Sequence, residues 1–269
     1  MPIILDTFAD YLANPGVGAH LAALMIESAR LFRDRQTGMA PNPDRPCFQI
    51  GRLVHMAVLE PLRYAATVRS RGPINEKTGK AFGRDTKAWM DWQADNPDVI
   101  VPEPWLPLAI ERMPAEVREC LRGTRREVSM YAEANGIAVK GRADALADGL
   151  IYDLKTIADI GDIDRDIAKH GYWFQAGWYA VVHELACGGI APAFEFIFME
   201  TAAPHRWRIV PMDADAMDYA TDKARDVMAQ IANRTAADDW IDDAPIRRPW
   251  LMPEWLLSEP TITAEGISL

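Results

Sequence analysis

Three acidic residues and a lysine are spaced so that two predicted turns bring them together on one face of a sheet. One Asn-Gly and one Asp-Gly dipeptide lie between residues 126 and 156, and both are strong two-residue hairpin signals because type I′ turns need positive φ. In the resulting register Glu127 faces Asp144 and Asp144 faces Asp153. Lys155 lies two residues further along the same face. This row predicts a site that works through carboxylates and a cation.

The chemistry of such a row follows from the repulsion between its acids. Carboxylates directly opposite one another on neighbouring strands repel by about 0.2–1 kcal/mol per pair. A bound cation would compensate, and Mg²⁺ typically takes one or two carboxylates together with water and phosphate oxygens. Lys155 would then lie at the rim of the ion site. The alternative is an ordinary solvated and charged face, and spacing alone leaves both interpretations open.

The other face of the same three strands is apolar. Alternate residues along each strand are hydrophobic, as expected for a sheet with one face on the core. We expect this face to be buried, and its residues are Val128, Met130, Ala132, Ile137, Val139, Ala143, Ala145, Leu150, Tyr152 and Leu154.

Four segments carry a family resemblance. The run GRAD at 141–144, followed by IYDLKT at 151–156, resembles the core of the PD-(D/E)XK nucleases. The segment GRLVH at 51–55 is similar to the histidine helix of the exonuclease VIII (RecE) type found in phages and prophages, and QAGWY at 175–179 resembles the Gln-xxx-Tyr helix of RecB-like relatives. The four segments also occur in the family's order.

Two positions depart from the family pattern. Asp153 stands where many superfamily members carry Glu, and Ala143 takes the place of the proline that often precedes the first acid. These departures change the consensus sequence of the motif more than they change the chemistry of the site.

The resemblance implies an α/β fold with a restriction-endonuclease-like core, in which helices flank a central mixed sheet. We expect residues 1–269 to form a single nuclease domain. Within it, 1–122 would be a mainly helical N-terminal region with the His helix, 123–234 the catalytic α/β core, and 235–269 a C-terminal tail.

The resemblance also implies metal-assisted hydrolysis of phosphodiester bonds. Mg²⁺, with Mn²⁺ as a substitute, would be held by His55, Asp144, Asp153 and the backbone carbonyl of Leu154. Lys155 would orient the attacking water and stabilise charge. Glu127 is included among the catalytic residues, although an acid ahead of the core is either a ligand or a strand-edge charge. The histidine, taken alone among apolar neighbours, would be read as structural.

Contacts with DNA are predicted at two places. Arg142, Gln175 and Tyr179 surround the acids in the sequence motifs, although Gln175 and Tyr179, four residues apart on one helix face, could simply pack in the core. Lys77, Lys80 and Arg84 belong to a second group.

That second group lies in a basic stretch of an acidic chain. The chain carries a net charge of −10, the main objection to a DNA enzyme. Residues 63–87, however, hold seven basic residues against two acids, 7 − 2 = +5. We predict that this stretch lines the DNA path, its alternative being a solvated surface loop.

The predicted function is a Mg²⁺-dependent exonuclease acting on linear double-stranded DNA in phage-type recombination. The resemblance implies ring-shaped homo-oligomers and a single-strand annealing protein as partner. A RecB-like single-strand nuclease or endonuclease is one alternative, and a catalytically inactive DNA-binding scaffold is another. The three cysteines are scattered singly, and four would be needed for an iron–sulfur cluster, so we expect none.

We expect no membrane association, because no apolar run approaches the roughly 18 residues of a spanning helix and the N-terminus lacks a basic leader region. The expected location is the cytoplasm of a bacterial host cell.

Periodicity predicts helices at 18–35, 51–60, 84–93, 172–187 and 214–233, one at 105–121 interrupted by Pro114, and strands at 194–200 and 207–211. Tryptophans 240, 250 and 255 of the tail are expected to dock on the body or a neighbouring subunit.

Overall fold

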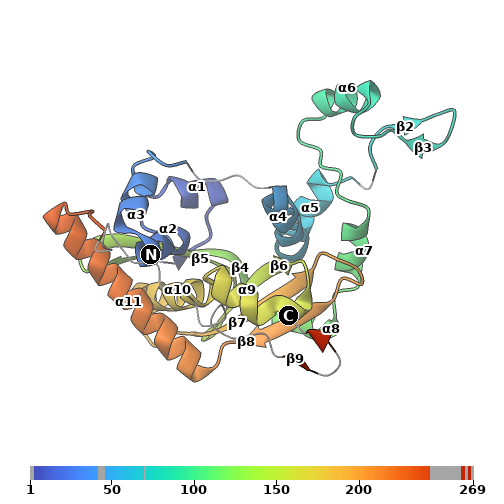
Figure 1. The fold of residues 1–269 in the computed structure, drawn as a ribbon. Coiled ribbons are helices and arrows are strands. Elements are labelled where there is room, and N and C mark those ends of the chain that lie inside the picture. Colours follow the sequence, from blue (N-terminus) through green and yellow to red (C-terminus); the bar gives the residue numbers. More distant parts are fainter. Residues whose placement is uncertain (1–2, 42–45, 70, 243–261, 264–265, 268–269) are drawn as a thin grey trace.

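The fold is a six-stranded mixed sheet with helices on both faces (Figure 1). The structure is a computed structural model, and it describes residues 3–41, 46–69, 71–242, 262–263 and 266–267. The strand order is β1-β4-β5-β6-β7-β8, and only β6 and β7 run parallel. The sheet strands are β1 (Ile3–Ile4), β4 (Arg125–Ala134), β5 (Ile137–Ala147), β6 (Leu150–Ile157), β7 (Ala193–Glu200) and β8 (Trp207–Pro211).

Helices precede, interrupt and follow the sheet in the chain. The N-terminal ones are α1 (Phe8–Ala13), α2 (Ala19–Glu27), α3 (Ala29–Gln36), α4 (Pro46–Leu59), α5 (Pro61–Thr67), α6 (Lys87–Asp95), α7 (Trp105–Glu111) and α8 (Ala115–Cys120). The crossover from β6 to β7 contains η1 (Ile160–Asp162), α9 (Ile163–Lys169) and α10 (Tyr172–Cys187), and α11 (Ala214–Ala237) follows β8. Two further hairpins are small: β2 (Ile74–Asn75) with β3 (Lys80–Ala81), and β9 (Ile262–Thr263) with β10 (Gly266–Ile267).

Two hydrophobic clusters cover the two faces of the sheet. Successive residues of β6 alternate between them, since Ile151 belongs to the first cluster and Tyr152 to the second. Helices α2, α3, α10 and α11 contribute to the first cluster, for example through Phe32 and Trp178. Helices α4, α7 and α8 contribute to the second, for example through Val54. A side chain that contacts helices from both faces of the sheet must therefore lie where two neighbouring strands separate.

The predicted hairpin registers are confirmed, but the ladder is interrupted at the acids. Pairs such as Val128 with Ala143 and Ala145 with Tyr152 have the expected register. The expected pairs of Asp144 with Glu127 and with Asp153 are missing from the ladder. Glu127 has φ of 52°, which takes it out of the extended conformation of a strand.

This interruption corrects the prediction of one continuous apolar face. Ala143 lies in the first cluster, whereas Ala145, two residues later on the same strand, lies in the second. Val128 and Val139 join the first cluster, and Leu154 joins the second. The predicted residues are indeed wholly or partly buried, but they pack on both faces because the strands change face at the acids.

The helix predictions are confirmed with local differences. The helix expected at 18–35 is two helices, because Ser28 is extended (φ −163°) and its hydroxyl caps α3 by accepting from the Leu31 N–H. The helix expected from 84 begins at Lys87, where Thr86 caps it. Pro114 does separate α7 from α8, as predicted.

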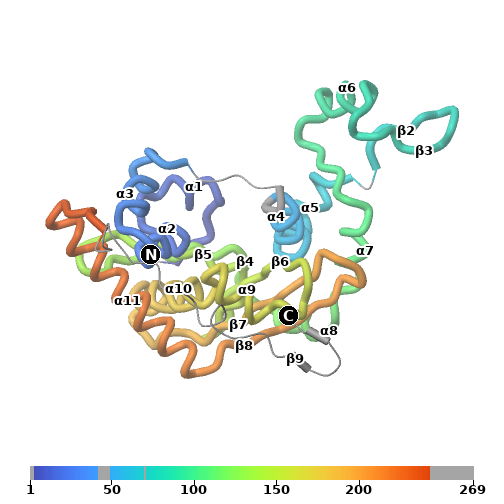
Figure 2. Tube along the Cα trace, in the orientation of Figure 1, coloured from blue at the N-terminus to red at the C-terminus, as the bar shows by residue number. Residues whose placement is uncertain are grey.

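Residues 61–69 and 71–104 form an arm that projects from the body, as the trace in Figure 2 shows. It contains α5, the β2–β3 hairpin and α6, and its two ends meet in a parallel bridge between Val68 and Ile100. The basic stretch predicted as a loop therefore includes a hairpin, with Lys77 in the turn and Lys80 on β3.

The tail is described in part. Trp240 is buried and stacks on Phe32 with ring centroids 5.4 Å apart, which confirms that it docks on the body. Trp250 and Trp255 lie outside the described residues. Within the described part of the chain, no helix combines the length and the apolarity needed to cross a membrane.

Close packing of α10 on α11 generates a first prediction. A Cβ at Gly177 would lie 2.2 Å from the Ala220 carbonyl oxygen. Alanine gains about 1 kcal/mol of helix propensity over glycine, but we expect the backbone clash to dominate and Gly177→Ala to destabilise the protein by about 1–3 kcal/mol. Urea unfolding measures this, with Gly189→Ala, where a Cβ meets no atom within 4 Å, as the control. Equal stability of the two variants would contradict the packing argument.

Candidate active site

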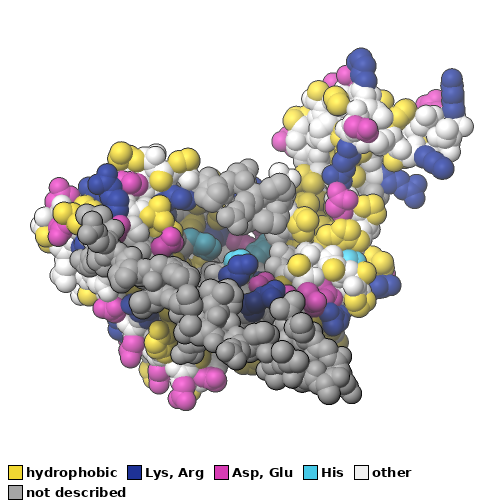
Figure 3. Space-filling view, viewed as in Figure 1, with side chains coloured by type: hydrophobic (Ala, Val, Ile, Leu, Met, Phe, Trp, Pro, Cys, Tyr) yellow, Lys and Arg dark blue, Asp and Glu magenta, His cyan; other side chains and the backbone are white. Residues whose placement is uncertain are grey.

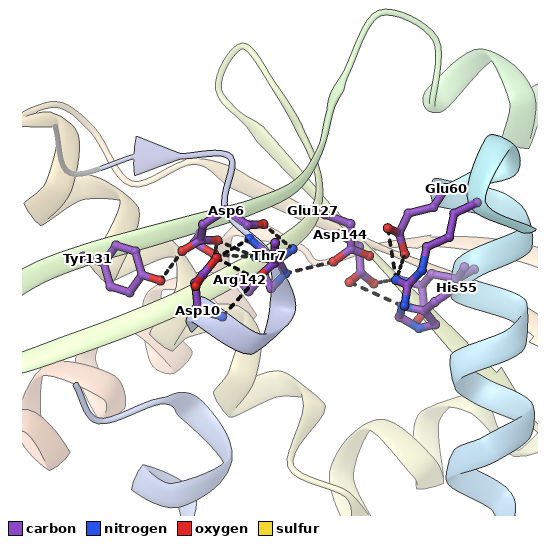
Figure 4. Close-up of polar contacts among 12 residues, drawn as sticks. Asp6, Thr7, Asp10, His55, Glu60, Glu127, Tyr131, Arg142 and Asp144 are labelled. Atoms are coloured by element: carbon purple, nitrogen blue, oxygen red, sulfur yellow. Dashed lines mark hydrogen bonds and ion pairs between the residues drawn. The ribbon is translucent and has the colours of Figure 1, made fainter. Parts of the chain in front are cut away.

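The interruption of the ladder brings two carboxylates and a histidine together. One ligand atom from each of His55, Glu127 and Asp144 lies within 4.8 Å of the others. The Asp144 Oδ2 accepts a hydrogen bond from the Leu154 N–H at 2.7 Å. A side chain of β5 thus supplies the acceptor for a backbone N–H of β6, which holds the carboxylate between the strands. Figure 4 shows Glu127 and Asp144 pointing toward His55 on α4.

His55 links α4 to both neighbouring strands. Its Nε2 donates to the Leu154 carbonyl oxygen at 2.7 Å, and its Nδ1 lies 3.5 Å from Asp144 Oδ1. Asp144 raises the pKa of His55 to about 9, although burial acts in the opposite direction. The histidine is thus charged at neutral pH. Before it could bind a metal ion through Nδ1, it would have to release a proton.

Asp153 and Lys155 form a second buried pair beside this group. Asp153 is 2% exposed, and its Oδ2 is paired with the Lys155 Nζ. The Gln175 side chain donates from α10 to Asp153 Oδ1 at 3.0 Å. The Lys155 Nζ also lies 4.9 Å from the ring centroid of Tyr172, over its face. These contacts hold the Asp-x-Lys segment against the first helical layer.

Burial and charge together determine the protonation of the acids. Burial raises the pKa of Asp153 to about 6, against the attraction of Lys155. Burial also raises the pKa of Glu127, and the charge of Asp144 adds to the effect. Asp144 is partly buried, which would raise its pKa, but His55 holds the pKa below the usual value. Burial opposes the charge of Lys155, yet Asp153 and Asp144 raise its pKa, so this lysine is protonated at neutral pH.

The donor set fits a small divalent cation. Two carboxylates and one imidazole are ligands for Mn²⁺ and, through the carboxylate oxygens, for Mg²⁺. Of the predicted ligands, the structure brings together His55 and Asp144, and it adds Glu127. Asp153 is engaged by Lys155 and Gln175, while the Leu154 carbonyl accepts from His55. Ligand roles for Asp153 and Leu154 therefore stay predictions that require these contacts to change.

Three of the residues predicted to contact DNA are buried in the structure. Arg142, Gln175 and Tyr179 are 8%, 6% and 6% exposed. Arg142 is bound between acids, Gln175 holds Asp153, and the Tyr179 ring packs at Gly141, where a Cβ would lie 3.0 Å from it. Arg142 and Gln175 thus bind acids of the protein itself, and DNA contacts by the three residues stay a prediction.

The basic residues of the arm differ in how they are engaged. Arg84 forms an ion pair with Glu103 at 3.2 Å and donates to the Val101 carbonyl oxygen at 2.8 Å. Lys77 and Lys80 make no ion pair with any residue that the structure describes, and both are exposed. Figure 3 shows basic side chains on the arm and, near the middle of this face, histidine, acidic and basic side chains gathered together.

Sequence reasoning missed Asp6, which contacts Arg142 from the N-terminal segment. Their ion pair is 2.8 Å long, and the two residues are 136 positions apart. An isolated aspartate just after a two-residue strand belongs to no motif. Only the pairing of β1 with β4 places it near the acids.

Comparisons with known proteins place the chain in a family. Residues 108–243 match the model of DUF3799, described as a PDDEXK-like domain of unknown function. This match spans half of the chain, so the protein belongs to that family. No curated protein matches the sequence.

Solved structures of similar fold include one from Eubacterium rectale, named as a candidate exonuclease. It is 14% identical, the alignment covers 95% of this chain and 98% of that one, and the TM-score is 0.61. The alkaline exonuclease LHK-Exo of Laribacter hongkongensis is 12% identical over 57% of this chain and 88% of its own, with a TM-score of 0.28. The TM-score with LHK-Exo is too low to indicate a common fold. The family match and the first structure confirm the predicted PD-(D/E)XK superfamily and α/β fold.

The charged His55 generates a prediction for the protein in EDTA. A histidine whose pKa is raised on folding stabilises the protein fully below its unfolded pKa of about 6.5, and it loses that contribution as pH rises through about 9. We expect stability to fall across this range in wild type and to fall less in His55→Gln. Urea unfolding at successive pH values measures both slopes, and identical slopes would show that the His55–Asp144 pair carries no charge.

Proposed function

We propose that this protein is a metal-dependent deoxyribonuclease that hydrolyses phosphodiester bonds. The observation that carries the proposal is the group His55, Glu127 and Asp144 within 4.8 Å, directly beside the Asp153–Lys155 pair. The family supports it, since residues 108–243 match a PDDEXK-like domain and the segments with Asp144, Asp153 and Lys155 resemble the pattern that gives such domains their name. Mg²⁺ is the proposed ion, with Mn²⁺ as a substitute.

The residues of the site would divide the work as follows. Asp144, Glu127 and His55 would hold the ion, which lowers the pKa of bound water and neutralises charge on the phosphate. Lys155 would remain protonated, because two carboxylates raise its pKa. It would therefore orient the attacking water and stabilise negative charge rather than remove a proton. Asp153 would keep Lys155 in place while Gln175 holds Asp153 from behind.

More specifically, we propose that the protein is an exonuclease that acts on the ends of linear duplex DNA in phage-type recombination. The resemblance of residues 51–55 and 175–179 to the exonuclease VIII and RecB-like segments supports it. We further propose one nuclease domain over residues 1–269, a homo-oligomeric ring, a single-strand annealing partner and a cytoplasmic location in a bacterial host. A buried Asp153–Lys155 pair argues against an inactive scaffold, since a decayed site would have no need for either charge.

Cleavage of end-labelled DNA tests the proposal. With Mg²⁺, we expect linear duplex to be degraded while covalently closed circles survive, and EDTA to stop the reaction. Asp144→Asn should lower the rate at least a hundredfold, because it weakens the ion site, whereas Asp148→Asn in the β5–β6 turn should not. Rapid nicking of closed circles would favour an endonuclease, and preference for single strands a RecB-like activity. No cleavage with any divalent ion would favour the scaffold.

The arm generates a separate prediction about DNA binding. Neutralising Lys77 and Lys80 to Gln should weaken binding and reduce the salt dependence by a slope of roughly 0.9 for each phosphate that the arm no longer neutralises. Filter binding at several salt concentrations measures the slope. The control is a double variant that carries Arg122→Gln and Lys223→Gln, both outside the arm. If both double variants show the wild-type slope, the arm does not bind the DNA backbone.

A further inference from the structure

Arg142 is buried between two carboxylates that come from different parts of the chain. Its Nε donates to Glu127 Oε2 at 2.9 Å, and its Nη1 donates to Asp6 Oδ1 at 2.8 Å and to Ser129 Oγ at 2.6 Å. Its Nη2 donates to the Asp6 carbonyl oxygen at 3.2 Å. Every nitrogen of the guanidinium thus has an acceptor within the protein, as Figure 4 shows for Asp6 and Glu127.

Asp6 is itself fixed in place. Its Oδ1 accepts from the Ser129 hydroxyl at 2.5 Å and its Oδ2 from the Tyr131 hydroxyl at 2.6 Å. Strand β1 pairs with β4 immediately before it, through Ile3 with Met130 and Ile4 with Ser129. The N-terminal segment therefore anchors one side of the guanidinium, and the other side is aimed at Glu127.

Glu127 needs such a restraint. It is a non-glycine residue with φ of 52°, a strained conformation that persists only where neighbours enforce it. This backbone conformation directs the Glu127 carboxylate to His55 and Asp144. Arg142 binds only Oε2, and no described residue forms a hydrogen bond with Oε1. One oxygen is thus held by Arg142, and the other has no hydrogen-bond partner among the described residues.

We propose that Arg142 is a positioning residue, held by Asp6, that fixes the Glu127 carboxylate as a ligand of the ion bound by His55 and Asp144. This inference rests on the proposed function, since it requires the ion. It also replaces the DNA contact that the sequence predicted for Arg142. The N-terminal segment is then part of the ion site, although it supplies no ligand.

The guanidinium is suited to this task because of its shape. A planar fork can bind two carboxylates at once in fixed directions, whereas the ammonium of lysine is a single flexible point charge. Arg142→Lys therefore keeps the positive charge and removes the geometry. A change in ion affinity in this variant would report orientation and not electrostatic repulsion.

The test is Mn²⁺ binding measured by calorimetry without DNA, so that no activity is needed. We expect Arg142→Lys to bind about tenfold more weakly than wild type, as is typical when a partner of a ligand is changed. Glu127→Gln should also bind more weakly, and Arg142→Lys should have no further effect in that background. The control is Lys140→Met, because buried Lys140 anchors the same segment at the carbonyls of Tyr11 and Asn14 and does not touch Glu127.

Each outcome bears on the inference. Wild-type affinity in Arg142→Lys would overturn it, and so would an equal loss in Lys140→Met or an undiminished effect in the Glu127→Gln background. If Arg142→Lys fails to fold, Asp6→Asn takes its place and should also weaken binding, with unchanged affinity overturning the inference. Wild type that binds no Mn²⁺ would overturn the proposed function as well, whereas the other outcomes leave that function standing.

Discussion

The separation of β5 from β6 at Asp144 is the constraint on which the site depends. The two strands pair only through residues 145–147 and 150–152, and beyond them the Asp144 carboxylate takes the Leu154 N–H. A continuous ladder would have kept the two helical layers apart. Because the strands diverge, His55 from α4 and Gln175 from α10 reach adjacent residues of β6, although these helices pack on opposite faces of the sheet.

Each acid around this opening is paired with a cation, and Arg142 serves two of them. A buried charge is tolerated only when it is paired and hydrogen-bonded, and each acid here meets a cation from another position in the chain. The pairs are Asp6 and Glu127 with Arg142, Asp144 with His55, and Asp153 with Lys155. Removing one partner would leave the other uncompensated, so the geometry of the site and the stability of the sheet are coupled. Because Arg142, His55 and Lys155 are paired inside the protein, their charges are compatible with the net negative charge of the chain.

The sequence was sufficient for those features that depend on local chemistry. Turn dipeptides determined both hairpin registers, and the periodicity of residues 172–187 predicted α10 with its observed ends. The departure of Glu127 from strand geometry could not be predicted, because glutamate carries no preference for positive φ and the conformation depends on contacts with Arg142. For the same reason the contact of Arg142 with Asp6 could not be predicted. Its partner Asp6 is distant in sequence, and a single arginine in a motif does not reveal which way it faces.

The separation between Asp6 and Arg142 also has a consequence for the order of events during protein synthesis. The residues are 136 positions apart, so a ribosome adding about 5–20 residues per second needs roughly 7–27 s to make the second after the first. For most of this interval Asp6 has neither β4 nor the guanidinium to bind. Asp6 is thus made well before the residues that hold it, and a nascent chain cannot assemble the ion site until the whole of β4 and most of β5 have left the ribosome.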